Sequence, residues 1–204
     1  MESTYVNKDE EIDRLINDLK SNGALDYGFH DNINPVYSTG KGLSRQVIEE
    51  ISEIKKEPDW MRRIRLHAYE IFMSKPVPTW GPDLSGIDWE NMTYYSSPDE
   101  VKATNWDEVP KEIKDTFEKL GVPEMERKYL AGSIAQYDSE GIYNSLKKEW
   151  EDKGVVFMDL DSALKRYPDL VKEYFAKAVP PSDNKFAALN VAVWSGGAFL
   201  YVPR

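Results

Sequence analysis

The sequence contains no cysteine. This absence excludes disulfide bonds, thiolate catalysis and Cys-ligated zinc or iron–sulfur sites within these residues. A zinc site held by three histidines is excluded as well, because His30 and His67 are the only histidines. Carboxylates could complete another metal set around either histidine, but we predict no metal site.

Long apolar runs and excess positive charge are also missing. No run of about 18 apolar residues exists, so we expect no transmembrane helix. The first residues are polar and acidic and lack the apolar core of a signal peptide, which predicts a cytoplasmic protein. With 26 Lys and Arg against 36 Asp and Glu, the net charge is −10, which disfavours nucleic acid and anionic membranes as partners.

Large apolar side chains are plentiful. Six Trp, twelve Tyr and seven Phe residues supply material for a core, and hydrophobic residues make up 41% of the chain. This composition predicts a folded globular protein rather than a disordered one. The length of 204 residues suits one large or two small domains.

The first half of the chain shows the apolar spacing of helices. Ser44 is a predicted N-cap, and Pro58 fits the first turn of a helix. Between the helices, residues 22–43 are predicted to form a loop. Residues 75–109 are predicted to be irregular and held to the surface by their aromatic rings. The predicted helices span residues 8–20, 44–56, 58–73 and 110–120.

The second half mixes short strands with helices. Asp138 or Ser139 is predicted to cap a helix that ends at Gly154, and Asp161 to cap another that ends near Tyr167. Residues 186–193 fit a helix or a strand equally well. A further helix is predicted over residues 168–175, and strands over 133–137, 155–158 and 199–202.

The predicted fold class is α+β. A mainly helical domain is expected over residues 1–130, with the irregular Pro- and aromatic-rich segment inside it. An α+β part is expected over residues 131–204. The composition changes near residues 125–135, which is why we place the boundary there.

Two glycine-containing motifs suggest chemistry at first sight. Gly40-Lys41 lacks the residue spacing of a phosphate-binding loop, so a turn before a helix is the better interpretation. Ser195-Gly196-Gly197 lacks the Gly-x-Ser-x-Gly pattern of a hydrolase nucleophile. We predict a tight turn there, with glycine needed for a positive φ or for close packing.

Carboxylate pairs leave two hypotheses open. Asp138 with Glu140, or Asp159 with Asp161, could form the general acid–base pair of a hydrolase. The three aspartates also stand where helices are predicted to begin, and capping explains them more simply. No catalytic residue is therefore assigned.

The remaining polar candidates have structural explanations. His67 stands among core-forming residues and is predicted to be a structural partner, whereas His30 lies in a polar loop. Arg62, Arg63 and Arg65 could bind an anionic partner, but neighbouring acidic residues favour ordinary pairing on a helix surface. Asp183-Asn184-Lys185 is predicted to be a helix cap and turn.

Several ordered segments resemble one family. They begin after residue 37 and continue nearly to the last residue, while the first 35 residues carry little of the resemblance. The most specific segments are Ala135-Gln136-Tyr137-Asp138-Ser139-Glu140, Pro168-Asp169-Leu170-Val171-Lys172-Glu173-Tyr174-Phe175 and residues 183–202. Together they are similar to the N-terminal part of the SufB scaffolds of iron–sulfur cluster assembly.

The resemblance implies a helical N-terminal domain that leads into a parallel β-helix, of which only the first strands are present. It also implies a complex with a SufC-like ATPase and a SufD-like subunit, fed by a cysteine desulfurase system. An iron–sulfur cluster belongs to that complex, and reduced flavin to some complexes of this kind; we assign neither to this chain. The cysteine and carboxylate ligands of the family lie beyond Arg204, so the sequence predicts an architectural, protein-binding piece without enzymatic activity.

Two further expectations follow. A β-helix cut at this point leaves a strand edge unpaired, so residues 190–204 are predicted to pair with another copy, to swap, or to lie irregularly against the helices. As an alternative function, the chain could be a stand-alone adaptor that binds a basic or ATPase partner through its acidic helices.

Overall fold

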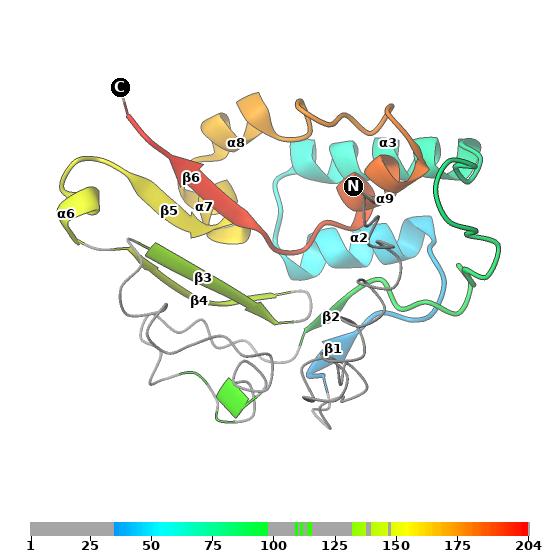
Figure 1. Cartoon of the computed structure of the whole chain (residues 1–204), viewed down its shortest axis with the longest axis horizontal. Helices are drawn as coiled ribbons and strands as arrows, with labels where there is room; N and C mark the ends of the chain where they lie inside the picture. Colours follow the sequence, from blue (N-terminus) through cyan, green and yellow to red (C-terminus); the bar gives the residue numbers. More distant parts are fainter. Residues whose placement is uncertain are drawn as a thin grey trace, which may run out of the picture. The chain divides into compact units, whose positions relative to one another are not determined.

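The computed structural model describes residues 35–97, 109, 111, 114–115, 132–137, 140–146 and 148–203, with only the backbone over 132–145. His30, the helix predicted over residues 8–20 and most of the one over 110–120 lie outside these ranges. Helices and strands both occur, which confirms the α+β class. The elements are β1 (Tyr37–Ser38), α2 (Arg45–Ile54), α3 (Asp59–Ser74), β2 (Ser96–Ser97), β3 (Gly132–Tyr137), β4 (Glu140–Leu146), α6 (Lys148–Glu151), β5 (Val156–Asp159), α7 (Leu160–Arg166), α8 (Pro168–Tyr174), α9 (Lys185–Val193) and β6 (Ala198–Tyr201) (Figure 1).

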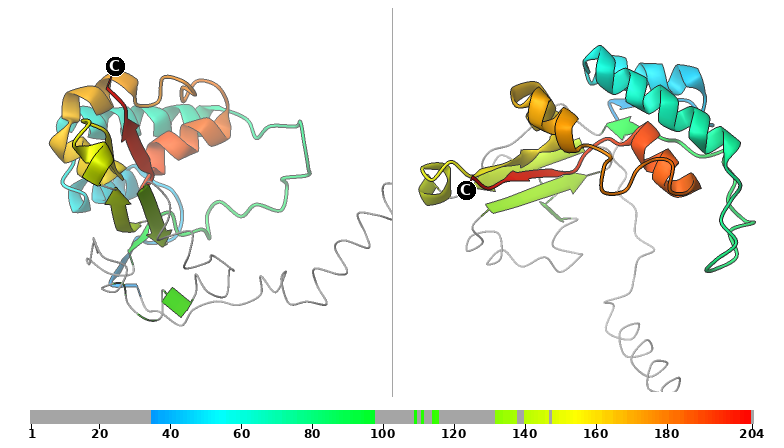
Figure 2. Two further views of the ribbon diagram at one scale, coloured as in Figure 1. Left: turned by 60° about the vertical axis from the view of Figure 1, so that its left-hand side comes forward. Right: turned by 90° about the horizontal axis from the view of Figure 1, so that it is seen from above.

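Helices α2, α3 and α9 pack against one another (Figures 1 and 2). The hydroxyl oxygen of Ser44 accepts a hydrogen bond from the Val47 amide at 3.2 Å, so the predicted N-cap of α2 is confirmed. Val47, Ile48 and Ile51 lie on one face of α2 and are buried. Among the described residues, no helix is long and apolar enough to cross a bilayer.

The ambiguous segment over residues 186–193 is helix α9. The side-chain oxygen of Asn184 accepts hydrogen bonds from the amides of Phe186 and Ala187, at 2.8 and 3.0 Å, and so starts the helix. This confirms the predicted cap. Because α9 contacts both α2 and α3, it is apolar on more than one face and shows little helical periodicity in sequence.

The predicted irregular segment is held by its aromatic rings in the part that the structure describes. Tyr94 and Tyr95 are buried. The Trp89 ring centroid lies 5.6 Å from that of Phe72 on α3 and 5.9 Å from that of Phe186 on α9. Apart from the two-residue strand β2, the rings fix the described part of this segment without regular structure, as predicted.

The strands form three antiparallel pairs: β1 with β2, β3 with β4, and β5 with β6. The strand predicted over 133–137 is confirmed as β3. The helix predicted to begin at Asp138 or Ser139 is wrong, because residues 140–146 form β4. Ile142 and Tyr143 favour a strand, and β3 supplies the backbone partners that stabilise it. Asp138 and Ser139 themselves lie outside the described residues.

Part of the segment 190–204 forms β6, which pairs within its own chain. Val156 of β5 lies opposite Tyr201 of β6, and Asp159 lies opposite Ala198. An irregular path is therefore wrong for Ala198–Tyr201, whereas pairing with another copy or a swap is not tested. Pairing with β5 of the same chain satisfies the backbone without the entropy cost of association. Three expectations stay predictions: self-association through the other edge of β6, the β-helix, and the domain boundary near residue 130.

The turn between α2 and α3 yields a test of backbone strain. Lys56 has φ of 53°, a left-handed conformation that disfavours residues with a side chain. We expect Lys56→Gly to raise the free energy of unfolding by about 0.5–1 kcal/mol, because glycine adopts this conformation freely. Urea unfolding of both proteins measures the change.

The matched control is Lys165→Gly on α7, an exposed lysine inside a helix. There glycine should lower the free energy of unfolding by about 1 kcal/mol. An equal loss of stability in both variants would contradict the role given to Lys56.

Candidate functional site

The most tightly built polar site surrounds Arg65 on α3. Its side chain is fully buried. Arg65 Nε donates to Glu57 Oε2 at 2.8 Å, and Nη2 donates to Glu57 Oε1 at 2.6 Å. This bidentate pair matches the planar geometry of guanidinium and carboxylate, and the Glu57 side chain is fully buried too.

The same guanidinium binds the C-terminal end of α9. Arg65 Nη1 donates to the Ala192 carbonyl at 3.0 Å, and Nη2 donates to the Trp194 carbonyl at 2.7 Å. The Trp194 ring centroid lies 4.6 Å from Arg65 Cζ. A cation at a helix C-terminus satisfies carbonyls that lack partners within the helix. Arg65 therefore connects the α2–α3 turn, α3 and the chain that leaves α9 towards β6.

A second buried ion pair lies between Lys55 and Asp161. Lys55 Nζ donates to Asp161 Oδ2 at 2.9 Å, and both side chains are less than a tenth exposed. The Lys55 ammonium also lies 5.5 Å from the centroid of the Tyr95 ring and 5.9 Å from that of Trp194. This pair joins the end of α2 to α7. We call the two ion pairs together the Arg65 junction.

Burial of these charges is costly, so each must keep its partner. Removing one partner of a buried ion pair leaves the other charge uncompensated. One further cost is visible: the buried indole N–H of Trp194 has no hydrogen-bond partner among the described residues. The main effect of the Arg65 junction is therefore to favour one arrangement of its helices. Its net contribution to the free energy of unfolding is the smaller effect.

The three arginines of the basic run have different surroundings. Arg62 Nε donates to Ser52 Oγ at 3.4 Å, and Arg63 is exposed. For Arg65 the predicted surface pairing is wrong. A signal was present: Arg65 falls on the buried stripe of α3 that also contains Met61, Ala68 and Phe72, and a cation within an apolar stripe indicates a buried pair.

The structure describes the side chains of Asp159 and Asp161 but not those of Asp138 and Glu140. Asp159 Oδ1 accepts a hydrogen bond from the Ser162 amide at 2.9 Å and caps α7, as the capping hypothesis predicted. The predicted cap at Asp161 is wrong, because its carboxylate pairs with Lys55. Asp138 lies outside the described residues, and for Glu140 only the backbone is described. An acid–base role for that pair stays untested.

His67 is exposed, so its prediction as a structural partner in the core is wrong. Its Nδ1 lies 3.9 Å from Glu70 Oε2 at the surface, one residue away from the buried stripe of α3. Among the described residues, no three His, Asp or Glu side chains gather into a group that could hold a metal ion.

The glycine motifs and Lys185 have structural roles. Lys41 forms an isolated antiparallel bridge with Thr93, and Gly42, with φ of 81°, donates its amide to the Met92 carbonyl at 2.9 Å. Gly197, directly before β6, has φ of 123°, so the predicted glycine at positive φ is confirmed. Lys185 Nζ donates to the carbonyls of Phe72 and Lys75 at 2.7 and 2.9 Å, and partial burial lowers the pKa of its ammonium.

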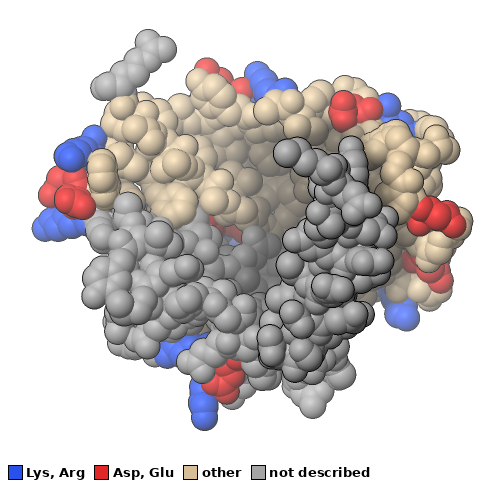
Figure 3. Space-filling model, viewed as in Figure 1, with Lys and Arg blue, Asp and Glu red and all other residues tan. Residues whose placement is uncertain are grey.

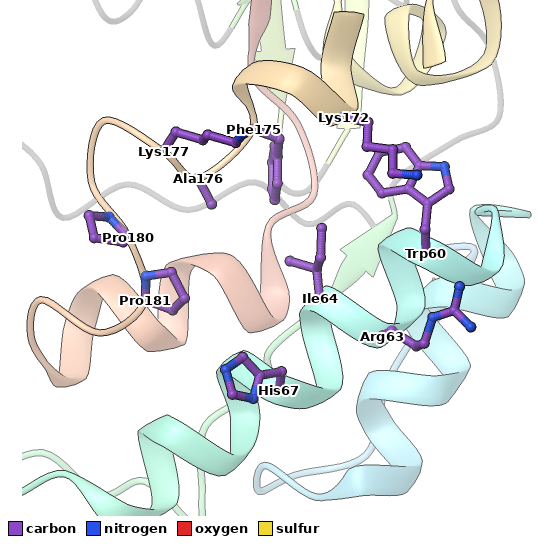
Figure 4. A pocket seen from close by; sticks show the side chains of 10 residues that line it. All are labelled: Trp60, Arg63, Ile64, His67, Lys172, Phe175, Ala176, Lys177, Pro180 and Pro181. Atoms are coloured by element: carbon purple, nitrogen blue, oxygen red, sulfur yellow. The ribbon is translucent and has the colours of Figure 1, made fainter. Parts of the chain in front are cut away.

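A groove of about 630 Å³ lies between α3 and the chain that follows α8 (Figure 4). We call it the α3–α8 groove. On the face shown in Figure 3, most of the described surface is uncharged, and side chains of both charges lie towards its outline. The groove is lined along α3 by Trp60, Ile64 and His67, and on the facing segment by Phe175, Pro180 and Pro181.

Comparison with known proteins gives one consistent result. A family model described as the SufBD protein N-terminal region matches residues 44–204. The iron-sulfur cluster assembly protein SufB of Bacillus subtilis is 52% identical over 182 residues, and a SufBD family protein of Staphylococcus haemolyticus is 53% identical over the same length. These alignments cover 89% of this chain but 39% of each relative, so the chain spans about two fifths of their length.

Loss of Arg65 should be far more damaging than loss of a surface arginine. We expect Arg65→Met to lower the free energy of unfolding by about 3–5 kcal/mol, because Glu57 and two carbonyls lose a buried partner. Adding Glu57→Leu should restore part of this loss by removing the unpaired charge. Urea unfolding of the single and double variants measures both effects.

Arg45→Met is the matched control. Arg45 forms an exposed ion pair with Glu49 at 3.0 Å, and its loss should cost less than about 1 kcal/mol. Similar losses for Arg45→Met and Arg65→Met would contradict the importance of the junction.

The Lys55–Asp161 pair can be tested by a double-mutant cycle. Lys55→Met, Asp161→Asn and the double variant should show a coupling energy of about 1–3 kcal/mol, since the two groups meet away from water. Additive losses would show that the pair contributes no interaction of its own.

Proposed function

Because the chain belongs to the family described as the SufBD protein N-terminal region, we propose that it acts in iron–sulfur cluster assembly as the N-terminal part of a SufB-like scaffold subunit. The observation that carries this proposal is the 52% identity to the Bacillus subtilis SufB protein over 89% of the chain. Such similarity over nearly the whole chain is far more specific than any single motif in it.

The proposed contribution of this chain is architectural and protein-binding rather than catalytic. The charged groups of the Arg65 junction are engaged with one another and with backbone carbonyls. Such groups orient helices and strands, because a buried charge tolerates few alternative partners. The absence of cysteine means that these residues supply no thiolate to a cluster, which we treat as the cargo of the whole assembly.

The wider assembly is part of the proposal. We propose a SufC-like ATPase, a SufD-like subunit and a cysteine desulfurase system as partners of the complete scaffold, in the cytoplasm. Reduced flavin and the cluster are proposed to be held by that complex, and no residue of this chain is assigned to either. We also propose that β6 leads into a β-helix, as the greater length of the relatives allows.

Replacement of the matching region in Bacillus subtilis SufB by this chain tests the function. We expect the chimaera to support the activity of iron–sulfur enzymes such as aconitase when the resident SufB is depleted, because about half of the aligned residues are identical. Aconitase activity in cell extracts, normalised to chimaera abundance, is the measurement.

The same chimaera with Arg65→Met should accumulate several-fold less, because destabilised proteins are degraded in cells. Arg45→Met serves again as the control and should leave abundance unchanged. A stable, abundant chimaera without any aconitase support would overturn the proposed function.

A further inference from the structure

The α3–α8 groove has an apolar floor that is open to solvent. Trp60 and Ile64 on α3 face Phe175 across it, and all three side chains are half-buried (Figure 4). Trp60 and His67 are seven residues apart, which is about 10 Å along a helix. This length matches about three residues of an extended peptide.

Positive charges surround this apolar floor. Arg63, Lys172 and Lys177 line the groove and are exposed. Within the described part of the chain, none of them has a carboxylate within 4.0 Å. Lys172 Nζ lies 5.9 Å from the centroid of the Trp60 ring. On a chain whose net charge is −10, these three basic side chains at one groove form a local cluster of positive charge.

Carboxylates stand close to these cations in sequence but do not pair with them. Asp59 precedes Arg63 by four residues, and Asp169 precedes Lys172 by three, and both are exposed. Pairs at this spacing on a helix can form ion pairs. Here the basic side chains instead line the groove, so their charge acts on whatever binds there.

The backbone of the facing wall is strained. Ala176 has φ of 55°, a conformation that disfavours a residue with a side chain. It directly follows Phe175 and precedes Lys177, so this turn sets the positions of an aromatic and a cationic side chain in the groove (Figure 4). Strain of this kind is concentrated at binding and switch regions.

We propose that the α3–α8 groove docks an extended acidic segment of a partner protein. An aromatic or large aliphatic side chain of that segment enters between Trp60 and Phe175. Carboxylates on either side of it meet Arg63, Lys172 and Lys177. This inference goes beyond the proposed function, since it names the chemistry of a binding surface and holds whichever protein carries the segment.

Charge and shape favour an acidic peptide segment over a single phosphate or a second copy of the chain. The cations are spread along two walls, which suits a linear chain of carboxylates better than a single phosphate. A two-fold dimer through this groove would place its cationic rim against an identical rim.

Panning of a random linear peptide library against the 204-residue chain tests the proposal. We expect the selected peptides to combine aromatic residues with neighbouring Asp and Glu. Fluorescence anisotropy of the best labelled peptide should show a Kd that rises with salt, because exposed charge pairs are screened over about 10 Å at 0.1 M ionic strength. A version of that peptide with Gln in place of Glu and Asp should bind at least about 10-fold more weakly.

Charge reversal on the protein supplies the decisive comparison. Arg63→Glu with Lys172→Glu should weaken binding at least about 10-fold, since the rim then repels the peptide. Both residues are exposed, so the fold should persist. The control, Arg45→Glu with Lys148→Glu, makes the same change in net charge outside the groove and should alter the Kd less than about 2-fold.

Three results would overturn the proposal: selection of peptides without acidic residues, equal weakening by both double variants, or self-association of the chain that Arg63→Glu with Lys172→Glu abolishes. The last result would identify a second copy as the occupant. Aconitase support by the chimaera is a separate readout, so either proposal can fail while the other stands.

Discussion

The bidentate pair between Arg65 and Glu57 is the interaction on which the other packing depends. One guanidinium satisfies a buried carboxylate and also two carbonyls at the end of α9. No other side chain offers several donors in a rigid plane with a permanent charge, so even lysine is a poor substitute. Because the charges are desolvated, the turn before α3 and the end of α9 must hold their positions for each charge to keep its partner.

Helix α3 carries two different surfaces because successive residues of a helix are rotated by about 100°. Arg65 points into the protein with the stripe of Met61 and Ala68, whereas Arg63, two residues earlier, lines the groove on the opposite side. One arginine of this short basic run therefore stabilises the fold, and another lines the groove that we propose for binding. The rigidity that Arg65 gives to α3 also fixes the groove wall, and a preformed wall lowers the entropy cost of binding.

Local signals predicted local structure well. The caps at Ser44 and Asn184 were predicted because a side-chain oxygen before an apolar run acts only on the next few amides. Helix α9 and strand β4 were harder, since α9 is apolar on several faces and β4 depends on pairing with β3. The Lys55–Asp161 pair joins residues 106 positions apart, and no local pattern indicates such a contact.

The junction also determines how the chain leaves its helical part. After α9, the Trp194 carbonyl is held by Arg65, and three residues later the Gly197 carbonyl accepts a hydrogen bond from the Leu160 amide at 3.0 Å. These two contacts place the residues that follow beside β5, where they form β6. In our proposal the β-helix of the complete scaffold continues from this strand. The orientation of this β-helix relative to the helices would then depend on one buried arginine. In our proposal, a region without cysteine contributes to cluster assembly by setting that orientation.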